Sequence, residues 1–491
     1  MEKLRKFLNI SSWQEFLATT DVWATRFMLL AFFVLAFGSA AQAPTEATNL
    51  QAGLAAQGQQ EYWRAESFFE QAALLAPDDY QPSLDLARLH LLEHQDNLAR
   101  SELATAQRLQ PDNADIWLAL GDVAQDQGNP QEAEQSWLQA THLNPAAAMQ
   151  AHERLGLLYE QQGRLQDAEV QFAALPGGDT LAQYQLGVLR LERGDRAAAR
   201  QAFEAALNQT SGNTQRNAAR SFLQAIDQWN GSAQSDRFVG LTYIENHLPA
   251  FAAASLKQAI ALAPNDANAH AYLSWVYLQS NAASQAQQEA LQAVKLDPRN
   301  SFARYVLSLL ALADGSYSSA INNLEQALAT DPRDPVLWAT RASIAEQLGD
   351  AVTAEQALRQ AATNAGSDPQ YSLLLATFYA DHQIGLSDET ALAAAQEAVA
   401  LAPTNGLAYD VLGRIEQAMN DFSAALNAFL QAANFAPTNA SIHVHLGNLQ
   451  ASLGYLRSAE LNLHKAIVLD FNGPTARQAQ QLLQGLPALG V

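Results

Sequence analysis

Ala263-Pro264-Asn265-Asp266, Asp297-Pro298-Arg299-Asn300 and Asp331-Pro332-Arg333-Asp334 divide the middle of this sequence into equal parts. The three prolines stand 34 residues apart, and an alanine-rich segment with helical periodicity precedes and follows each of them. Proline ends a helix because it lacks an N–H and collides with the preceding turn. The Asn or Asp that follows can cap the next helix. The spacing therefore predicts a unit of helix, tight turn, helix and proline stop, and a fixed period in this range indicates a solenoid.

The same period extends over most of the chain. Further prolines keep the 34-residue spacing, and Phe471 takes the proline position of the last unit; these prolines are Pro77, Pro111, Pro145, Pro403 and Pro437. Twelve units in register cover residues 46–473. Residues 214–232 interrupt the period with an extra amphipathic helix, which we interpret as a packed spacer, with a hinge as the alternative. A longer turn at Ala380–Asp388 is the second interruption.

The units resemble the tetratricopeptide repeat, whose pattern is W-x2-L-G-x2-Y, then A-x3-F, then P. Trp117 to Gly121 and Leu155 to Tyr159 fit the first part, although Ala124 replaces the tyrosine in the former. Four pairs fit A-x3-F: Ala65 with Phe69, Ala168 with Phe172, Ala199 with Phe203 and Ala425 with Phe429. The resemblance implies an all-α fold, a right-handed α-solenoid of about twelve helical hairpins.

The predicted domains follow from this register. We expect a short cytoplasmic segment over 1–21, a transmembrane signal anchor or signal peptide over 22–43, and a first array of five repeats over 44–213. The spacer over 214–232 precedes a second array of seven repeats over 233–473. Pro474 begins a last helix, so that 474–491 form a capping helix and tail.

The N-terminal segment has an uncharged run from Phe27 to Ala43, at the short limit for crossing a bilayer. We interpret it as an uncleaved anchor, because the preceding part is long for a signal peptide. Cleavage after Ala41 or Ala43 is the alternative. Lys3, Arg5 and Lys6 precede the run, which places the repeats outside the cytoplasm. The expected location is the cell membrane, or a secreted or periplasmic state after cleavage.

Composition narrows the range of functions. The chain has 50 acidic and 28 basic residues, a formal net charge of −22, and no cysteine. Such a chain repels phosphate backbones, so we expect no nucleic-acid partner. Without cysteine, it has neither disulfides nor thiolate chemistry. We find no phosphate-binding loop and no serine-nucleophile motif, and we predict no cofactor and no small-molecule substrate.

One motif points to metal chemistry. His90-Leu91-Leu92-Glu93-His94 matches H-x-x-E-H, the inverzincin zinc-protease signature. The two histidines could face one metal from successive helical turns. They also occupy the tyrosine and turn positions of the second repeat, and no further ligand is identifiable. We interpret the match as coincidental and predict no metal site; a zinc hydrolase remains a remote alternative.

What the residues do offer is a surface. In tetratricopeptide repeat proteins the first helices of successive hairpins line a groove that binds peptides or partner helices. By this resemblance, the candidate groove residues are Trp275, Leu278, Phe302, Tyr305, Leu309 and Leu312, unless these side chains pack against the adjacent hairpin. A second candidate is an acidic patch for basic segments, or an ordinary solvated face: Asp115, Asp122, Asp126, Glu153 and Glu160. Only Arg88, Arg237 and Arg414 occur at groove positions, so a clamp for a C-terminal carboxylate is not predicted.

The sequence therefore predicts a non-enzymatic protein-interaction scaffold. It would be tethered to the membrane through its N-terminal helix and would recruit envelope, secretion or polysaccharide-export components. An accessory subunit of a separate glycosyltransferase complex is the alternative function. The identity of the protein or peptide partner is not encoded in these residues.

Overall fold

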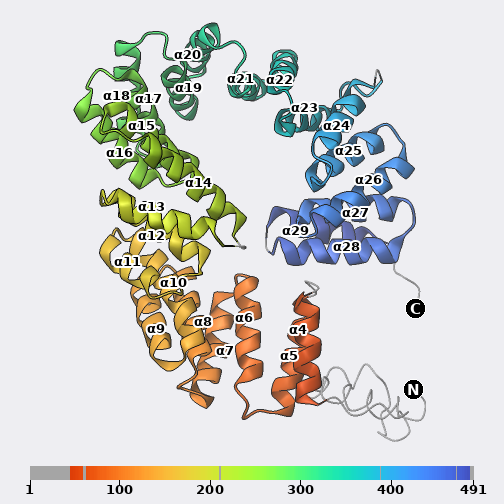
Figure 1. Ribbon diagram of the computed structural model, residues 1–491. Coiled ribbons are helices and arrows are strands. Elements are labelled where there is room, and N and C mark those ends of the chain that lie inside the picture. Colours follow the sequence, from red (N-terminus) through yellow and green to blue (C-terminus); the bar gives the residue numbers. More distant parts are fainter. Residues whose placement is uncertain (1–44, 59–61, 210–211, 388, 472, 487–491) are drawn as a thin grey trace, which may run out of the picture. The chain divides into compact units, whose positions relative to one another are not determined.

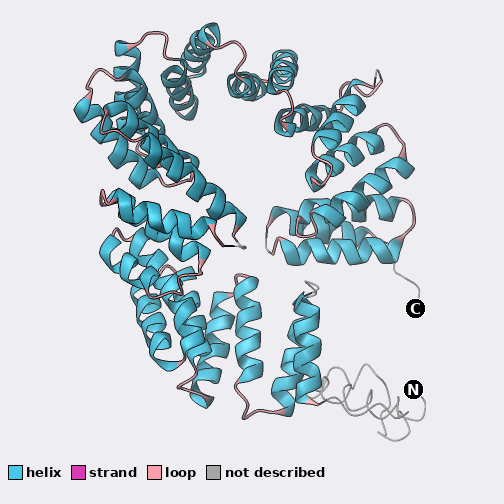
Figure 2. Ribbon diagram, in the orientation of Figure 1, coloured by secondary structure: helices cyan, strands magenta, loops and turns pink. Residues whose placement is uncertain are grey.

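The computed structural model describes residues 45–58, 62–209, 212–387, 389–471 and 473–486. These residues form helices and no strand (Figures 1 and 2). The signal anchor or signal peptide predicted over 22–43 lies outside the described residues. Among the helices that are described, none is long and apolar enough to cross a bilayer.

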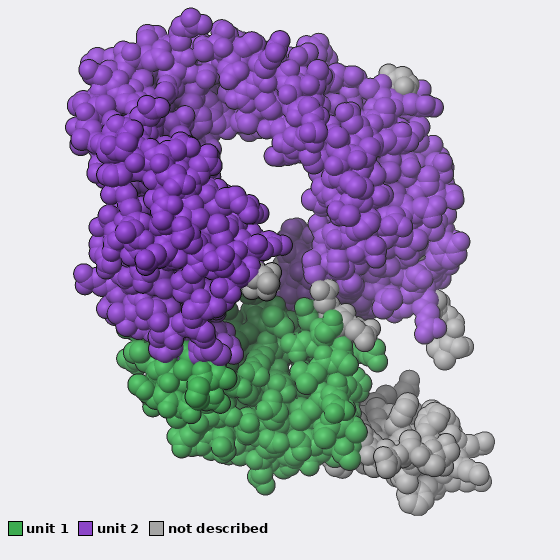
Figure 3. All heavy atoms as spheres, viewed as in Figure 1, with its two compact units in different colours: residues 1–148 green, residues 149–491 purple. Residues whose placement is uncertain are grey.

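The chain divides into two compact units, Met1–Ala148 and Met149–Val491 (Figure 3). Unit 1 contains hairpins in which each helix packs against the next: α4 (Glu46–Gly58) with α5 (Tyr62–Leu75), α6 (Gln81–Leu92) with α7 (Asp96–Leu109), and α8 (Ala114–Asp126) with α9 (Pro130–Leu143). Helix α10 (Pro145–Gln161) begins at the end of unit 1 and continues into unit 2.

Unit 2 continues the pattern with α11 (Leu165–Ala173), α12 (Thr180–Glu192), α13 (Arg196–Leu207), α14 (Asn213–Gln228), α15 (Ala233–Glu245), α16 (Pro249–Leu262), α17 (Ala267–Gln279), α18 (Ala283–Leu296), α19 (Ser301–Ala313), α20 (Tyr317–Thr330), α21 (Pro335–Gln347), α22 (Ala351–Ala365), α23 (Pro369–His382), α24 (Thr390–Leu401), α25 (Gly406–Ala418), α26 (Phe422–Phe435), α27 (Ala440–Ser452), α28 (Leu456–Leu469) and α29 (Pro474–Gly485). In the described residues, α4–α13 make five hairpins and α15–α28 make seven, with α14 and α29 unpaired. The all-helical solenoid predicted from the period is confirmed.

The helices that follow the prolines begin with the side-chain caps that the sequence predicts. The Asp266 carboxylate accepts hydrogen bonds from the backbone N–H groups of Asn268 and Ala269, both at 3.1 Å. Asn300 and Asp334 cap α19 and α21 in the same way. These contacts satisfy N–H groups that the first turn of a helix leaves without partners. Each new hairpin can therefore begin directly after the proline with hydrogen-bond partners for these backbone N–H groups.

Neighbouring hairpins share one core. Ala271 of α17, Ala293 of α18 and Ala303 of α19 lie in the same buried cluster, although they belong to two different repeats. These three alanines are fully buried. The core of each hairpin is thus completed by the next hairpin, as repeat architectures require.

The spacer helix α14 is packed on both sides within unit 2. The Phe222 ring stacks on Phe203 of α13 with centroids 5.0 Å apart, and it meets Tyr243 of α15 at 5.1 Å. Residues 214–232 therefore continue the core between the fifth and sixth hairpins. The boundary between the two compact units falls within α10, at a position that the sequence pattern does not mark.

The second interruption and the C-terminal helix appear where the sequence places them. Helix α23 ends at His382 and α24 begins at Thr390, and the connecting turn is long, with Gln383 in the left-handed region at φ 52°. Helix α29 buries Ala479 against Val444, Leu463 and Ala466. It therefore covers the apolar edge of the last hairpin.

Candidate functional site

The candidate groove contains an aromatic cluster, formed by Tyr272 and Trp275 of α17 with Phe302 and Tyr305 of α19. The ring of Trp275 lies 5.9 Å from that of Phe302 and 6.0 Å from that of Tyr305, which it stacks against. Tyr272 approaches Phe302 to 5.3 Å. Helices α17 and α19 are the first helices of successive hairpins and pack directly on each other. Two repeats thus bring together residues that lie about one repeat apart in sequence.

All six residues predicted for the groove are partly buried. Trp275, Leu278 and Phe302 pack with one side against a core cluster that includes Val306 and Leu307. Tyr305 and Leu312 similarly pack against a core cluster formed by α20 and α21, while Leu309 belongs to none of the described clusters. Five of these side chains therefore contribute to the stacked core, and all six keep part of their surface exposed. Packing against neighbouring helices, the alternative left open by the sequence, therefore describes five of these residues, and their role in a groove stays a prediction.

Hydroxyl groups continue the cluster toward α21 and α23. Burial raises the pKa of Tyr305, a hydrogen bond with Thr340 lowers it, and the Asp334 carboxylate raises it again. Burial also raises the pKa of Tyr371 on α23, with contributions from Asp368 and Asp334. Both phenols are neutral hydrogen-bonding groups near neutral pH. The two phenol groups therefore add hydrogen-bonding capacity beside the aromatic rings without adding charge.

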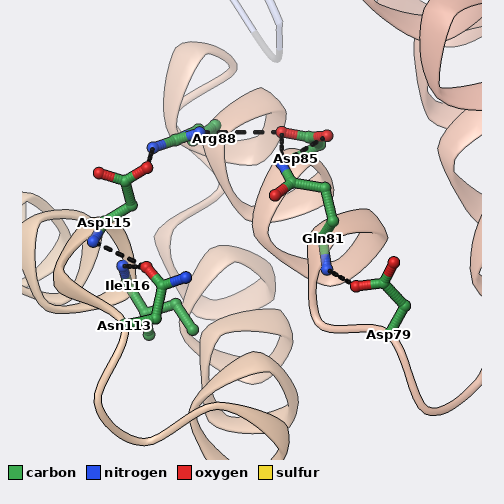
Figure 4. A network of polar contacts seen from close by, with 7 residues as sticks. All are labelled: Asp79, Gln81, Asp85, Arg88, Asn113, Asp115 and Ile116. Atoms are coloured by element: carbon green, nitrogen blue, oxygen red, sulfur yellow. Dashed lines mark hydrogen bonds and ion pairs between the residues drawn. The ribbon is translucent and has the colours of Figure 1, made fainter.

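Arg88, one of the three arginines at groove positions, belongs to a polar network in unit 1 (Figure 4). Its guanidinium lies 3.4 Å from the Asp115 carboxylate on the next first helix and 3.8 Å from Asp85 on its own helix. Gln81 donates from its amide to both oxygens of Asp85, at 3.0 and 3.1 Å. Arg88 therefore bridges α6 and α8.

The other two groove arginines also pair with a carboxylate from an adjacent repeat. Arg237 of α15 donates to both oxygens of Asp266, at 2.8 and 2.9 Å. Arg414 of α25 forms an ion pair with Asp381 of α23. The sequence pattern shows these arginines as isolated, whereas the structure neutralises each of them. None of the three is available as a free cation for an anionic ligand.

Sequence comparison agrees with this architecture. Residues 97–141, 118–180 and 311–377 match the family described as tetratricopeptide repeat. Residues 97–180 and 311–377 are therefore similar to tetratricopeptide repeats. No curated protein matches the sequence.

Several solved structures are similar to this chain. A structure of the yeast Tom70 is 15% identical with a TM-score of 0.38, and the match covers 90% of this chain and 95% of that one. A chain from the Cut9–Hcn1 hetero-tetramer of APC/C is 14% identical with a TM-score of 0.38, and the match covers 89% of this chain and 96% of that one. A structure of Pseudomonas aeruginosa pilF is 16% identical with a TM-score of 0.37, and the match covers 44% of this chain and 97% of that one.

The predicted acidic patch is distributed over the two units. Asp115, Asp122 and Asp126 lie on α8 in unit 1, whereas Glu153 and Glu160 lie on the part of α10 that belongs to unit 2. Asp115 pairs with Arg88, and Asp122 accepts a hydrogen bond from the Trp137 indole at 3.1 Å. Two of these carboxylates therefore already have partners within the repeats.

The H-x-x-E-H match falls across the end of a helix. Helix α6 ends at Leu92, so of the two histidines only His90 lies in the helix. The side chain of His90 is buried. His94 lies in the turn with φ 56°. The two histidines therefore do not lie on successive turns of one helix, because the chain leaves the helix between them. In the described part of the chain, no group of three or more potential ligands could hold a metal ion.

A cavity at the junction of α14 and α15 was not predicted from the sequence. Its volume is about 250 Å³, and it is lined by Gln228, Asn230, Ser232, Gln234, Ser235, Arg237, Phe238 and Leu241. Five of these residues come from α15, the first helix of the sixth repeat, and Arg237 is at a groove position of that helix. The cavity arises where the spacer interrupts the period, and the regular repeat pattern gives no indication of it.

Proposed function

We propose that this chain is a non-enzymatic protein-interaction scaffold, with the aromatic cluster of α17 and α19 as its principal docking point. The observation that carries the proposal is the stacking of partly exposed Trp275 on Tyr305 across two repeats. Clustered aromatic side chains that are fixed by packing lose little entropy when a partner covers them. Such residues dominate binding energy in protein interfaces.

The paired arginines at the groove positions support an apolar partner segment without an anionic anchor. Arg237 and Arg414 are held by Asp266 and Asp381, so neither can bind a terminal carboxylate without breaking an ion pair. Tetratricopeptide repeats in general serve as protein-interaction modules, and the similarity of residues 97–180 and 311–377 to these repeats supports the proposal.

The location of the scaffold rests on the sequence of the N-terminal segment. We propose that residues 22–43 act as a signal anchor, or as a cleaved signal peptide, and that the repeats assemble envelope, secretion or polysaccharide-export components outside the cytoplasm. A reporter that is active only in the cytoplasm, fused after residue 491, tests this placement. Strong reporter activity contradicts it, and the interaction proposal would stand without it.

The docking proposal is tested by affinity capture from solubilised membranes. Trp275→Ala combined with Tyr305→Ala removes the stacked pair, and Leu309→Gln changes a partly exposed groove residue that belongs to none of the described core clusters. We expect both variants to lose the partners recovered with the wild type. Phe422→Ala combined with Tyr455→Ala is the matched control, because both aromatics are exposed and lie outside the groove register.

Equal recovery by all variants removes the aromatic cluster from the interaction. Circular dichroism of each purified variant shows whether the helices are intact. Since Leu309→Gln leaves the core clusters unchanged, a loss of partners in this variant with an unchanged helical spectrum identifies a binding effect rather than unfolding.

A further inference from the structure

The cavity between α14 and α15 opens to the surface, and its polar lining residues Gln228, Asn230 and Gln234 are exposed. The carboxamides of Gln228 and Gln234 make no hydrogen bond within the described residues, and the Asn230 amide nitrogen makes none either. Phe238 and Leu241 supply apolar surface. A volume of about 250 Å³ is about eight times the share of one liquid water. It suits one side chain rather than a drug-sized ligand.

An anion does not fit this cavity, although the cavity includes the start of α15. The backbone N–H of Ser235 is already bonded to the Ser232 hydroxyl at 3.3 Å, and that of Ser232 to the Asn230 side-chain oxygen at 3.1 Å. Arg237 is committed to Asp266. Two of the backbone donors near this helix start, and the one guanidinium that lines the cavity, are therefore occupied, which makes an anion a poor occupant.

The surrounding charges cancel. The Arg196 guanidinium lies 3.3 Å above the Trp229 ring, and the Trp229 indole donates to the buried Asp236 carboxylate at 2.9 Å. Arg196 and Arg237 thus balance Asp236 and Asp266, and Asp227 is paired separately with Arg200 at 2.5 Å. No carboxylate lines the cavity, so a cation has no counter-charge there. A neutral group that both donates and accepts hydrogen bonds is what remains.

Polar contacts connect the cavity to the aromatic cluster within unit 2. Arg237 reaches from the cavity lining to Asp266 at the start of α17. Asn300, which caps α19, donates to the Asn268 side chain on α17 at 2.9 Å. Phe302 of the aromatic cluster lies two residues after Asn300. The helix starts of α15, α17 and α19 thus form one continuous edge from the cavity to the rings.

We propose that this cavity is a subsite for an Asn or Gln side chain of the same protein segment whose apolar residues contact the aromatic cluster. The partner carboxamide exchanges hydrogen bonds with Gln228 and Gln234 and places its carbon stem against Phe238. This inference rests on the proposed docking function, and it adds a specificity element at the interruption of the repeats.

The test uses a random 12-residue peptide library displayed on phage and selected on the full-length chain in detergent. We expect selected peptides to be enriched in apolar residues and, at a fixed distance from these, in Asn or Gln. Selection on Gln228→Ala combined with Gln234→Ala should keep the apolar enrichment and lose the amide enrichment. Gln224→Ala is the matched control, since this exposed glutamine of α14 does not line the cavity.

A selected peptide in which the Asn or Gln is changed to Ala should bind about fivefold more weakly, the value of one hydrogen bond. This difference should vanish on the double variant. Enrichment of acidic or basic residues instead of amides, or amide enrichment that persists on the double variant, overturns the subsite but leaves the docking function intact. Two results overturn both the subsite and the docking function. Selection on the wild-type chain gives no enrichment, or selection on Trp275→Ala gives the same enrichment as selection on the wild type.

Discussion

Phe172 fills the space directly above Gly156. A Cβ atom at position 156 would lie 2.7 Å from both Cε1 and Cζ of the Phe172 ring, well inside van der Waals contact. The two residues lie on the facing helices α10 and α11 of one hairpin, and the ring is fully buried. The absence of a side chain at position 156 is therefore what allows an aromatic ring at position 172.

Gly156→Ala should destabilise this hairpin by about 1–2 kcal/mol, because the overpacking cost exceeds the gain in helix propensity. Adding Phe172→Leu should recover most of the loss. Hydrogen exchange of peptides from α10 and α11 measures the local effect. Gly58→Ala is the control, since a Cβ there meets nothing within 4 Å. Unchanged exchange in Gly156→Ala would show that the hairpin can expand.

The sequence alone carries much of this packing rule. At the equivalent positions, aromatic residues on the second helix occur only opposite glycine, as in Gly121 with Trp137, whereas alanine opposes leucine in Ala87 with Leu103. The period and this pairing predict the helices, the hairpins and their core. They do so because each repeat repeats the same local geometry.

The site is less predictable, since it depends on contacts between repeats. The partner of Arg88 is Asp115, 27 residues on, whereas the partner of Arg414 is Asp381, 33 residues back. No fixed spacing identifies such pairs, because the side chains reach across a varying distance between neighbouring helices. The cavity beside Gln234 depends on the path of the chain after α14, which an interrupted period does not specify.

Trp229→Phe should destabilise the junction of α14 and α15 by about 1–3 kcal/mol. Phenylalanine preserves an aromatic ring for Arg196 but removes the indole N–H that bonds the buried Asp236 carboxylate. Urea unfolding followed by circular dichroism measures the change. Trp63→Phe, at an exposed tryptophan, should leave the midpoint unaltered. Equal midpoints for both variants would show that the indole–carboxylate bond contributes nothing net.

Glu416 should make the stability of the C-terminal repeats depend on pH. Burial, and then the nearby Asp421 carboxylate, raise the pKa of Glu416 from 4.5 to about 7. The folded state therefore binds more protons than the unfolded state between pH 4.5 and 7, and stability falls as pH rises through this window.

Glu416→Gln should raise the Tm by about 1–3 °C at pH 8, a small effect because the side chain is partly exposed, and should have little effect at pH 4. Thermal unfolding at both pH values measures the difference. Glu397→Gln, which removes the same charge from an exposed site on α24, should not reproduce this pattern. A gain at pH 8 from both variants would indicate general charge repulsion instead.

Gln81→Ala should weaken unit 1 in a pH-dependent way. Burial raises the pKa of Asp85, and the hydrogen bond from Gln81 lowers it. Removing that amide leaves a carboxylate that is only 5% exposed with Arg88 at 3.8 Å as its remaining partner. We expect a loss of about 1–2 kcal/mol at pH 7, and a smaller loss at pH 3, where the carboxyl is protonated in both states.

Hydrogen exchange of α6 peptides at the two pH values measures this loss of stability. Gln71→Ala is the control, because the Gln71 amide bonds an exposed serine. An equal loss at both pH values would mean that Gln81 acts through packing and not through the charge of Asp85.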